Sequence, residues 1–292
     1  MKSAEHTIFE NEQYTLSGTF FKSKNEHSNK TIVYFHGGGL IFGTKNDLPN
    51  EYVNLITEEF NLFSVAYRLV PESDLNDIFE DLTHIYDYTK KNFTDEIYVL
   101  GRSAGGYLSY LFSKHFEVSG AFILYGYYDF THRDFMSLPK DQVKFAPMLS
   151  SSIEKQNVKF EVITEALPNP RFLLYLYYRN ESLWQKKLGV NLEDNKYFLT
   201  DEDLKHMPKT VLVHSNNDPD VPFDYSKHAS TLIPDCKFIE LDKNTHDFDQ
   251  TVTDETLQIY REALEFLAWL KSAAEAALFF IVWTSVCGDT WF

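Results

Sequence analysis

The sequence predicts an α/β fold built on a mostly parallel, doubly wound sheet. Short runs of almost continuous apolar residues alternate with segments of helical periodicity, a pattern typical of strands that helices cover on both faces. One such run, residues 96–100, leads through Gly-Arg-Ser-Ala-Gly at 101–105 directly into a helical segment. With 292 residues, 43% of them hydrophobic, the chain is long enough for one large α/β core.

The predicted elements follow in order along the chain. Strands are expected at residues 14–21, 31–35, 62–69, 97–100 and 121–125, and the first alternates apolar and polar residues like an edge strand. Helices are expected at residues 50–59, 74–91 and 104–116. The pattern resumes near the C-terminus with strands at 210–214 and 237–241 and with helices at 223–232 and 255–270.

Residues 130–207 interrupt this alternation. The segment is rich in Phe and Tyr, contains Pro168 and Pro170, and lies between two predicted sheet strands. We expect a mostly helical cap over the carboxyl ends of the strands, where open α/β sheets bind ligands. Its aromatic residues suggest an apolar lid. Residues 1–129 and 208–271 are then expected to form the core.

Composition limits the classes of partner. The net charge of −16 and the pI of about 5.0 argue against nucleic acids and anionic membranes. The two cysteines, Cys236 and Cys287, lie far apart without a ligand pattern, so neither a disulfide framework nor a metal site is expected. The polar N-terminal residues lack the apolar core of a signal peptide, and a cytoplasmic location is expected.

The C-terminal residues 272–292 break the pattern. The apolar stretch at 276–286 would cover about 16 Å as a helix, which is too short to span a bilayer. We expect a vector-derived or read-through tail, outside the fold. The alternative is a helix that docks on a partner, and an exposed apolar strip of this kind favours association, including a homo-oligomer.

Ser103 is the candidate nucleophile. A strand that turns sharply into a helix at Gly-x-Ser-x-Gly is typical of a nucleophile elbow. Gly101 and Gly105 remove the side chains that would clash in this turn. The serine hydroxyl is then held at the start of a helix, beside free backbone N–H groups.

A serine nucleophile needs a base and an acid, which follow it along the chain in this architecture. The candidate acid is Asp218, in the loop after the predicted strand at 210–214, with Asp220 as its local competitor. The candidate base is His246, just after the last predicted strand. His214 and His228 are less well placed, because they fall inside a strand and a helix.

The candidate oxyanion hole follows the strand at 31–35. Gly37, Gly38 and Gly39 let backbone N–H groups point into a cavity without obstruction by side chains. We expect Gly38 and Gly39, together with the N–H of Ala104, to stabilise an oxyanion. His36 is expected to have a structural role.

These residues resemble the α/β-hydrolases of the hormone-sensitive-lipase-like esterase group. The resemblance rests on HGGG at 36–39, YRLVPE at 67–72 and the elbow followed by a second glycine at 106, and it covers residues 12–270. It implies an α/β-hydrolase sheet with an inserted helical cap, a Ser103–Asp218–His246 triad and no cofactor. Two features depart from the family: Arg102 stands where an acid is usual, and the N-terminal cap helices have no room.

Three hypotheses about function remain. The first is a serine hydrolase that cleaves carboxylic esters of small acyl or aryl groups through an acyl-enzyme. The second is an amidase, formamidase or small peptidase with the same triad. The third is a ligand-binding protein on a hydrolase fold without activity, since a fold does not fix a function. A small-molecule ester is the substrate expected from the first hypothesis.

Overall fold

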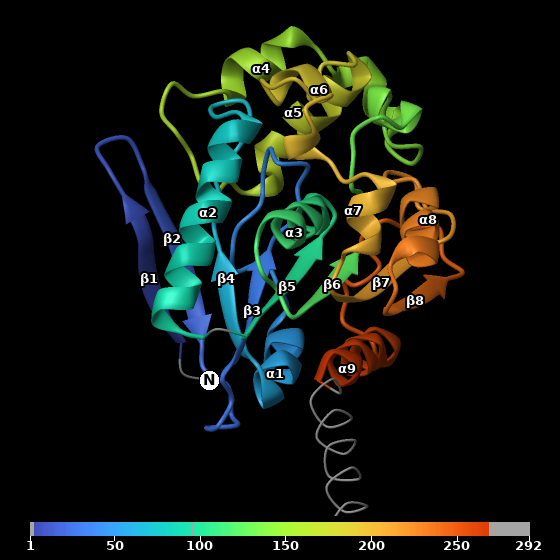
Figure 1. Ribbon diagram of the computed structural model, residues 1–292. Helices are drawn as coiled ribbons and strands as arrows, with labels where there is room; N and C mark the ends of the chain where they lie inside the picture. Colours follow the sequence, from blue (N-terminus) through green and yellow to red (C-terminus); the bar gives the residue numbers. More distant parts are fainter. Residues whose placement is uncertain (1–2, 95, 269–292) are drawn as a thin grey trace, which may run out of the picture.

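The computed structural model describes residues 3–94 and 96–268 (Figure 1). An eight-stranded sheet has the strand order β1-β2-β4-β3-β5-β6-β7-β8. The strands are β1 (Ser3–Glu10), β2 (Thr15–Phe21), β3 (Lys30–Phe35), β4 (Asn61–Val65), β5 (Glu96–Arg102), β6 (Gly120–Leu124), β7 (Lys209–Ser215) and β8 (Cys236–Leu241). Strands β3 to β8 run parallel, whereas β2 pairs antiparallel with both β1 and β4. The prediction of a mostly parallel sheet is therefore confirmed.

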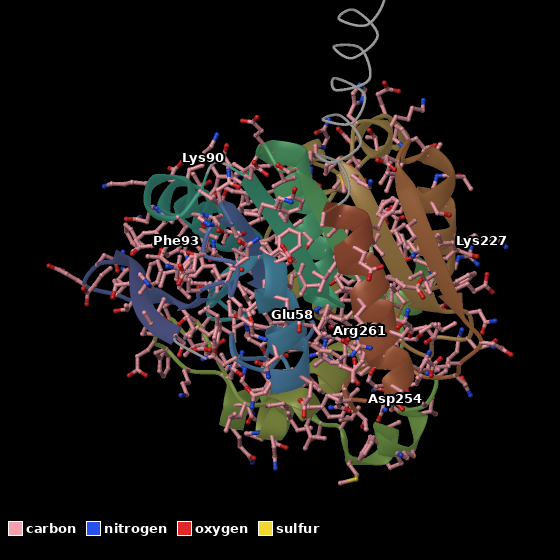
Figure 2. The ribbon with its side chains drawn as sticks, turned by 90° about the horizontal axis from the view of Figure 1, so that it is seen from below. Glu58, Lys90, Phe93, Lys227, Asp254 and Arg261 are labelled. Atoms are coloured by element: carbon pink, nitrogen blue, oxygen red, sulfur yellow. The ribbon has the colours of Figure 1, made fainter. Side chains whose placement is uncertain are left out.

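Helices cover both faces of this sheet, as the doubly wound prediction requires. One face packs against α2 (Leu75–Asn92), α3 (Ala104–His115) and α8 (Asp224–Leu232), whose buried residues share one core cluster. The other face packs against α1 (Asn50–Glu59) and α9 (Asp254–Ala268), which contribute Tyr52 and Tyr260 to a second cluster. Figure 2 shows these two helices side by side, with Glu58 on α1 and Arg261 on α9.

A long insertion separates β6 from β7. It contains η1 (Arg133–Met136), η2 (Val143–Met148), α4 (Ser151–Asn157), α5 (Pro168–Asn180), α6 (Trp184–Lys187), η3 (Asn195–Tyr197) and α7 (Asp201–Lys205). Figure 1 shows α4, α5 and α6 grouped at one end of the sheet. Trp184 of α6 donates a hydrogen bond of 2.9 Å to the Gly39 carbonyl, in the loop that follows β3. The insertion thus reaches the carboxyl end of the sheet.

Two expectations about the elements need correction, and a third concerns residues that the structure does not describe. The edge of the sheet is β1 and not the predicted strand at 14–21, because the polar Ser3–Glu10 segment pairs with β2 in an exposed position. The strand predicted at 62–69 ends at Val65, where the pairing with β3 stops. The predicted tail at 272–292 lies outside the described residues.

Candidate active site

Ser103 lies at the turn between β5 and α3 with a left-handed backbone. Its φ of 54° and ψ of −116° are rare for a residue with a side chain and indicate a strained turn. A Cβ on Gly105 would overlap the carbonyl oxygen of Phe35, and a Cβ on Gly101 would overlap that of Gly105. Both glycines are therefore required where the elbow crosses the neighbouring backbone.

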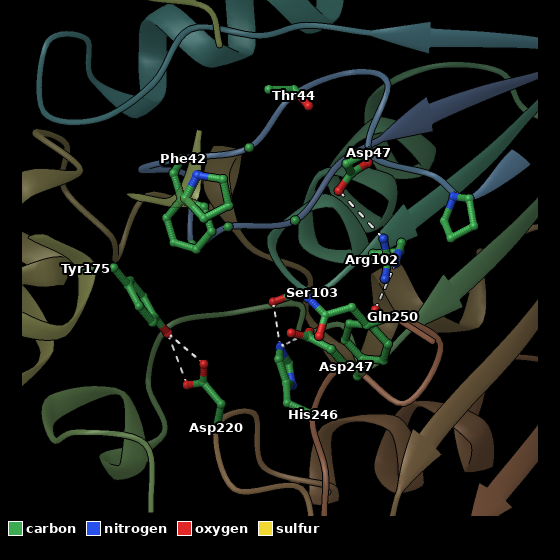
Figure 3. Close-up of a pocket in the computed structure, with 17 residues that line it drawn as sticks. Phe42, Thr44, Asp47, Arg102, Ser103, Tyr175, Asp220, His246, Asp247 and Gln250 are labelled. Atoms are coloured by element: carbon green, nitrogen blue, oxygen red, sulfur yellow. Dashed lines mark hydrogen bonds and ion pairs between the residues drawn. The ribbon is translucent and has the colours of Figure 1, made fainter. Parts of the chain in front are cut away.

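The structure brings the three predicted side chains into one hydrogen-bonded chain. His246 Nε2 lies 2.8 Å from Ser103 Oγ, and His246 Nδ1 lies 2.7 Å from Asp218 Oδ2. With Nδ1–H donating to the carboxylate, Nε2 is free to accept the serine proton. Figure 3 shows the His246 ring below Ser103.

Asp218 is buried, and its carboxylate is fully hydrogen-bonded. The backbone N–H groups of Asp220 and Val221 donate to Oδ1 at 2.8 and 3.0 Å, and His214 Nε2 lies 3.1 Å from Oδ2. Burial alone would raise the pKa of Asp218, but the charge of His246 and the hydrogen bonds from both histidines hold it well below its ordinary value. Asp218 therefore stays ionised. His214, which sequence reasoning set aside, supports the acid.

Asp220, the competing acid, has other partners. Its carboxylate accepts hydrogen bonds from Tyr175 at 3.0 and 3.1 Å and pairs with Arg179 at 2.7 Å. No hydrogen bond joins it to His246 in the described part of the chain. The two carboxylates therefore face different partners.

The electrostatic surroundings of His246 favour its charged form. Burial lowers the pKa of His246, but the Asp218 charge and hydrogen bond, followed by the Asp247 and Asp220 charges, raise it above its ordinary value. Asp247 Oδ1 lies 3.9 Å from His246 Nε2. An imidazolium formed during a reaction would be stabilised here.

The glycine loop after β3 presents unused backbone donors. The N–H groups of Gly38, Gly39 and Ala104 have no acceptor within the residues that the structure describes. Gly38 and Gly39 have φ values of 101° and 61°, which side chains rarely adopt. Buried His36 places Nδ1 2.8 Å from the Gly37 carbonyl, a contact within the loop.

A cavity of about 220 Å³ opens beside Ser103. Figure 3 shows Phe42 and Tyr175 on one side of the nucleophile and Asp47, Arg102 and Gln250 on the other. The first side carries two aromatic rings and the Asp220 carboxylate bonded to Tyr175, and the second is polar and charged. Apart from Asp220 and from Arg102, which stands inside the Gly-x-Ser-x-Gly motif, the sequence did not indicate these lining residues, because they come from separate loops with no local motif.

Neither a metal site nor a membrane span is evident within the described ranges. No group of three or more His, Cys, Asp or Glu residues in 3–94 and 96–268 could hold a metal ion. None of the helices in these ranges combines the length and apolar character needed to cross a bilayer.

Comparisons with known proteins place this geometry in context. A family model described as alpha/beta hydrolase fold matches residues 32–250. A Staphylococcus aureus protein of unknown function is 32% identical, with a TM-score of 0.87 over 91% of this chain and 98% of that one. An alpha/beta hydrolase superfamily protein from Enterococcus faecalis is 26% identical, with a TM-score of 0.78 over the same shares.

A more distant structure is similar in fold. Carboxyl esterase 2 of Tuber melanosporum is 18% identical, with a TM-score of 0.58 over 86% of this chain and 81% of that one. A comparison with curated protein sequences gave no match.

Proposed function

Because this chain belongs to the α/β hydrolase fold family, we propose that it is a serine hydrolase that cleaves carboxylic esters of small acyl or aryl groups. The observation that carries the proposal is the hydrogen-bonded chain from Ser103 Oγ through His246 to Asp218, at 2.8 and 2.7 Å. These distances suit transfer of a proton from a serine to a histidine that a carboxylate orients, which supports the proposal.

The proposed reaction proceeds through an acyl-enzyme. His246 Nε2 takes the proton of Ser103 as Oγ attacks the ester carbonyl, and Asp218 stabilises the imidazolium. The N–H groups of Gly38, Gly39 and Ala104 donate to the oxyanion, and each donor contributes about 3–4 kcal/mol in such sites. His246 then protonates the leaving alcohol. Water then attacks the acyl-enzyme carbonyl as His246 takes its proton. His246 returns this proton to Ser103 Oγ, and the carboxylic acid is released.

The size of the cavity supports a small substrate. At about 220 Å³ it is smaller than the roughly 300–1,000 Å³ of sites for drug-sized ligands. Phe42 and Tyr175 offer apolar contact to a short acyl or aryl group. We therefore place small neutral esters first among the substrates.

We propose further that residues 130–207 act as a cap on a core formed by 1–129 and 208–271. Pro168 and Tyr175 of this segment line the cavity beside Ser103. Tyr175 also lies close to Gly39, where an added Cβ would come within 2.6 Å of its ring. The segment would thereby shape the space above the nucleophile.

The experiment is hydrolysis of p-nitrophenyl butyrate by the wild type and by Ser103→Ala. We expect the variant to lose at least about 10³-fold in kcat, because the nucleophile is gone. Ser113→Ala is the matched control, since Ser113 lies on the same helix and donates to the Ser109 carbonyl at 2.8 Å. The proposal fails if Ser103→Ala retains the rate or if a fluorophosphonate probe leaves Ser103 unlabelled in the wild type.

A further inference from the structure

Arg102, directly before the nucleophile, is buried in a network that the proposed reaction does not use. Only 7% of the residue is exposed. Its Nε donates to the Tyr125 hydroxyl at 2.9 Å, and its Nη2 lies 3.1 Å from Asp249 Oδ1. Nη1 lies 3.6 Å from Asp47 Oδ2 (Figure 3). Each of the three nitrogens of the guanidinium therefore faces an acceptor within the protein, and two of these acceptors are carboxylates.

Asp249, on the other side of the pair, is a fully buried carboxylate. Its Oδ1 also accepts from the Tyr125 hydroxyl at 2.6 Å, and its Oδ2 accepts from Tyr260 of α9 at 2.7 Å. Arg102 is the one Lys or Arg within ion-pair distance of Asp249 in the part of the chain that the structure describes. Without Arg102, the carboxylate would be buried with no cation, a costly arrangement.

The pair joins the two loops that carry the nucleophile and the base. Arg102 adjoins Ser103, and Asp249 follows His246 by three residues. The bridging Tyr125 also packs the edge of its ring against the His246 ring, with centroids 4.7 Å apart at 62°. Through Tyr125 the pair is thus in contact with the imidazole that faces Ser103 Oγ.

We propose that Arg102 and Asp249 are positioning residues, whose buried ion pair sets the distance between Ser103 Oγ and His246 Nε2. This role rests on the proposed function. It accounts for a cation at the position where the family usually has an acid. Because the partner acid comes from the histidine loop, the charge of Arg102 is used within the protein and not on the substrate.

The test measures kcat, KM and fluorophosphonate labelling of Ser103 in Arg102→Met, Arg102→Lys and Asp249→Asn. We expect kcat and the labelling rate to fall about 100-fold in Arg102→Met and in Asp249→Asn, because a displacement of about 1 Å at a reacting pair has an effect of this size. KM for p-nitrophenyl butyrate should change less than threefold. Arg102→Lys should recover part of the rate. The double variant should lose no more than either single variant.

Two variants separate positioning from stability. Tyr125→Phe keeps the packed ring but removes the hydroxyl that hydrogen-bonds to both Arg102 and Asp249, which loosens the pair without leaving a charge unpaired. Its rate should fall about tenfold even if Arg102→Met does not fold. Arg68→Met is the matched control, because Arg68 forms a buried pair with Asp81 at 3.0 Å away from the cavity. It should lower the Tm and leave kcat within threefold.

The outcomes also distinguish a positioning role of Arg102 from direct binding of the substrate by Arg102. If Arg102→Met raises KM for p-nitrophenyl hydrogen succinate alone and leaves kcat unchanged, Arg102 binds the substrate carboxylate and the proposal is overturned. A wild-type rate in folded Asp249→Asn overturns it equally. Unlabelled Ser103 in the wild type would instead refute the proposed function, so the two failures are separable.

Discussion

Asp218 and Asp220 lie two residues apart in one loop, yet their carboxylates face different partners. Asp218 accepts from His246 at 2.7 Å, whereas Asp220 pairs with Arg179. We expect Asp218→Asn to lower kcat by about 10³–10⁴-fold, because an amide favours the wrong tautomer of the histidine. Asp220→Asn should lose about tenfold or less. Steady-state hydrolysis by both variants checks this, and equal losses would contradict the assignment of Asp218.

The pH dependence follows from the charges around His246. Asp218, Asp247 and Asp220 raise the pKa of His246, against the effect of burial, and the base must be neutral to act. Activity is therefore absent at low pH and appears as the pH rises through this elevated pKa. We expect the acidic limb of the profile of kcat/KM to lie above pH 6.5, the ordinary pKa of histidine.

The variant Asp247→Asn provides a comparison for the pH profile of kcat/KM of the wild type. Removing the carboxylate that lies 3.9 Å from His246 Nε2 should move the acidic limb to lower pH. The kcat/KM profile measured from pH 5 to 10 checks both statements. A limb at or below pH 6.5 in the wild type, or one that Asp247→Asn leaves in place, would refute the electrostatic account.

Sequence reasoning reached some site residues and not others for a physical reason. Ser103 follows a strand within a glycine pattern, and His246 follows the last predicted strand, so local spacing and chain order predict where they lie. The roles that we assign to them remain predictions. Arg102 and Asp249 are 147 positions apart, and nothing near either residue in the sequence indicates its partner. Only the folded chain shows that pair.

At the scale of elements, Arg171 joins helix α5 to the loops that follow β3 and β4. Its guanidinium contacts Glu72 at 2.8 Å through both Nη atoms and donates to the carbonyls of Ile41 and Val70 at 2.7 Å. The Glu72 side chain is fully buried. Together with the hydrogen bond from Trp184 to the Gly39 carbonyl, the Arg171 side chain links the segment at 130–207 to the loops that follow β3 and β4.

We expect Arg171→Met to lower the free energy of unfolding by about 3–5 kcal/mol, because it leaves the buried Glu72 carboxylate unpaired. Adding Glu72→Gln should recover part of that loss, since the remaining group is neutral. Urea denaturation of both proteins measures the effect. The exposed Arg133, also in this segment, is the control, and Arg133→Met should change stability by about 0.5 kcal/mol or less. Equal losses at both arginines would contradict the argument.

The hydrophobic pattern of the sequence predicted most strands and helices, but it did not indicate β1 or the short helices between β6 and β7. Strands β3, β5, β6 and β7 are buried along their whole length or nearly so, and each was predicted within a few residues. Strand β1 was missed because an exposed edge strand carries no apolar run. The short helices of the insertion also gave no clear period, because each is about one or two turns long.

At the scale of the whole molecule, the family resemblance is confirmed and the substrate remains a proposal. The family match and the fold agree with the hormone-sensitive-lipase-like motifs seen in the sequence. The substrate depends instead on loops that surround one cavity. The residues that line this cavity are spread along the sequence from Gly37 to Gln250. No single stretch of sequence contains enough of them to define the pocket.

The charge of the molecule predicts discrimination between substrates. The chain carries −16 overall, and the carboxylates of Asp47 and Asp247 at the cavity are 33% and 51% exposed. Arg102 is already paired with Asp249, so the cavity should repel an anion. We expect kcat/KM for p-nitrophenyl hydrogen succinate to be at least about tenfold below that for p-nitrophenyl butyrate at low salt.

The salt dependence of kcat/KM distinguishes electrostatic repulsion of the anionic ester from its steric exclusion. Raising ionic strength from about 0.01 to 1 M shortens the Debye length from about 30 to 3 Å, so the difference between the two esters should narrow. The neutral ester should respond little and serves as the control. At a pH on the plateau of both profiles, where His246 is neutral, Asp247→Asn should raise the rate for the anionic ester alone. If the tenfold ratio persists unchanged at high salt, steric exclusion of the terminal carboxylate, which is bulkier than the methyl group of butyrate, and not the negative field of the cavity, sets the preference.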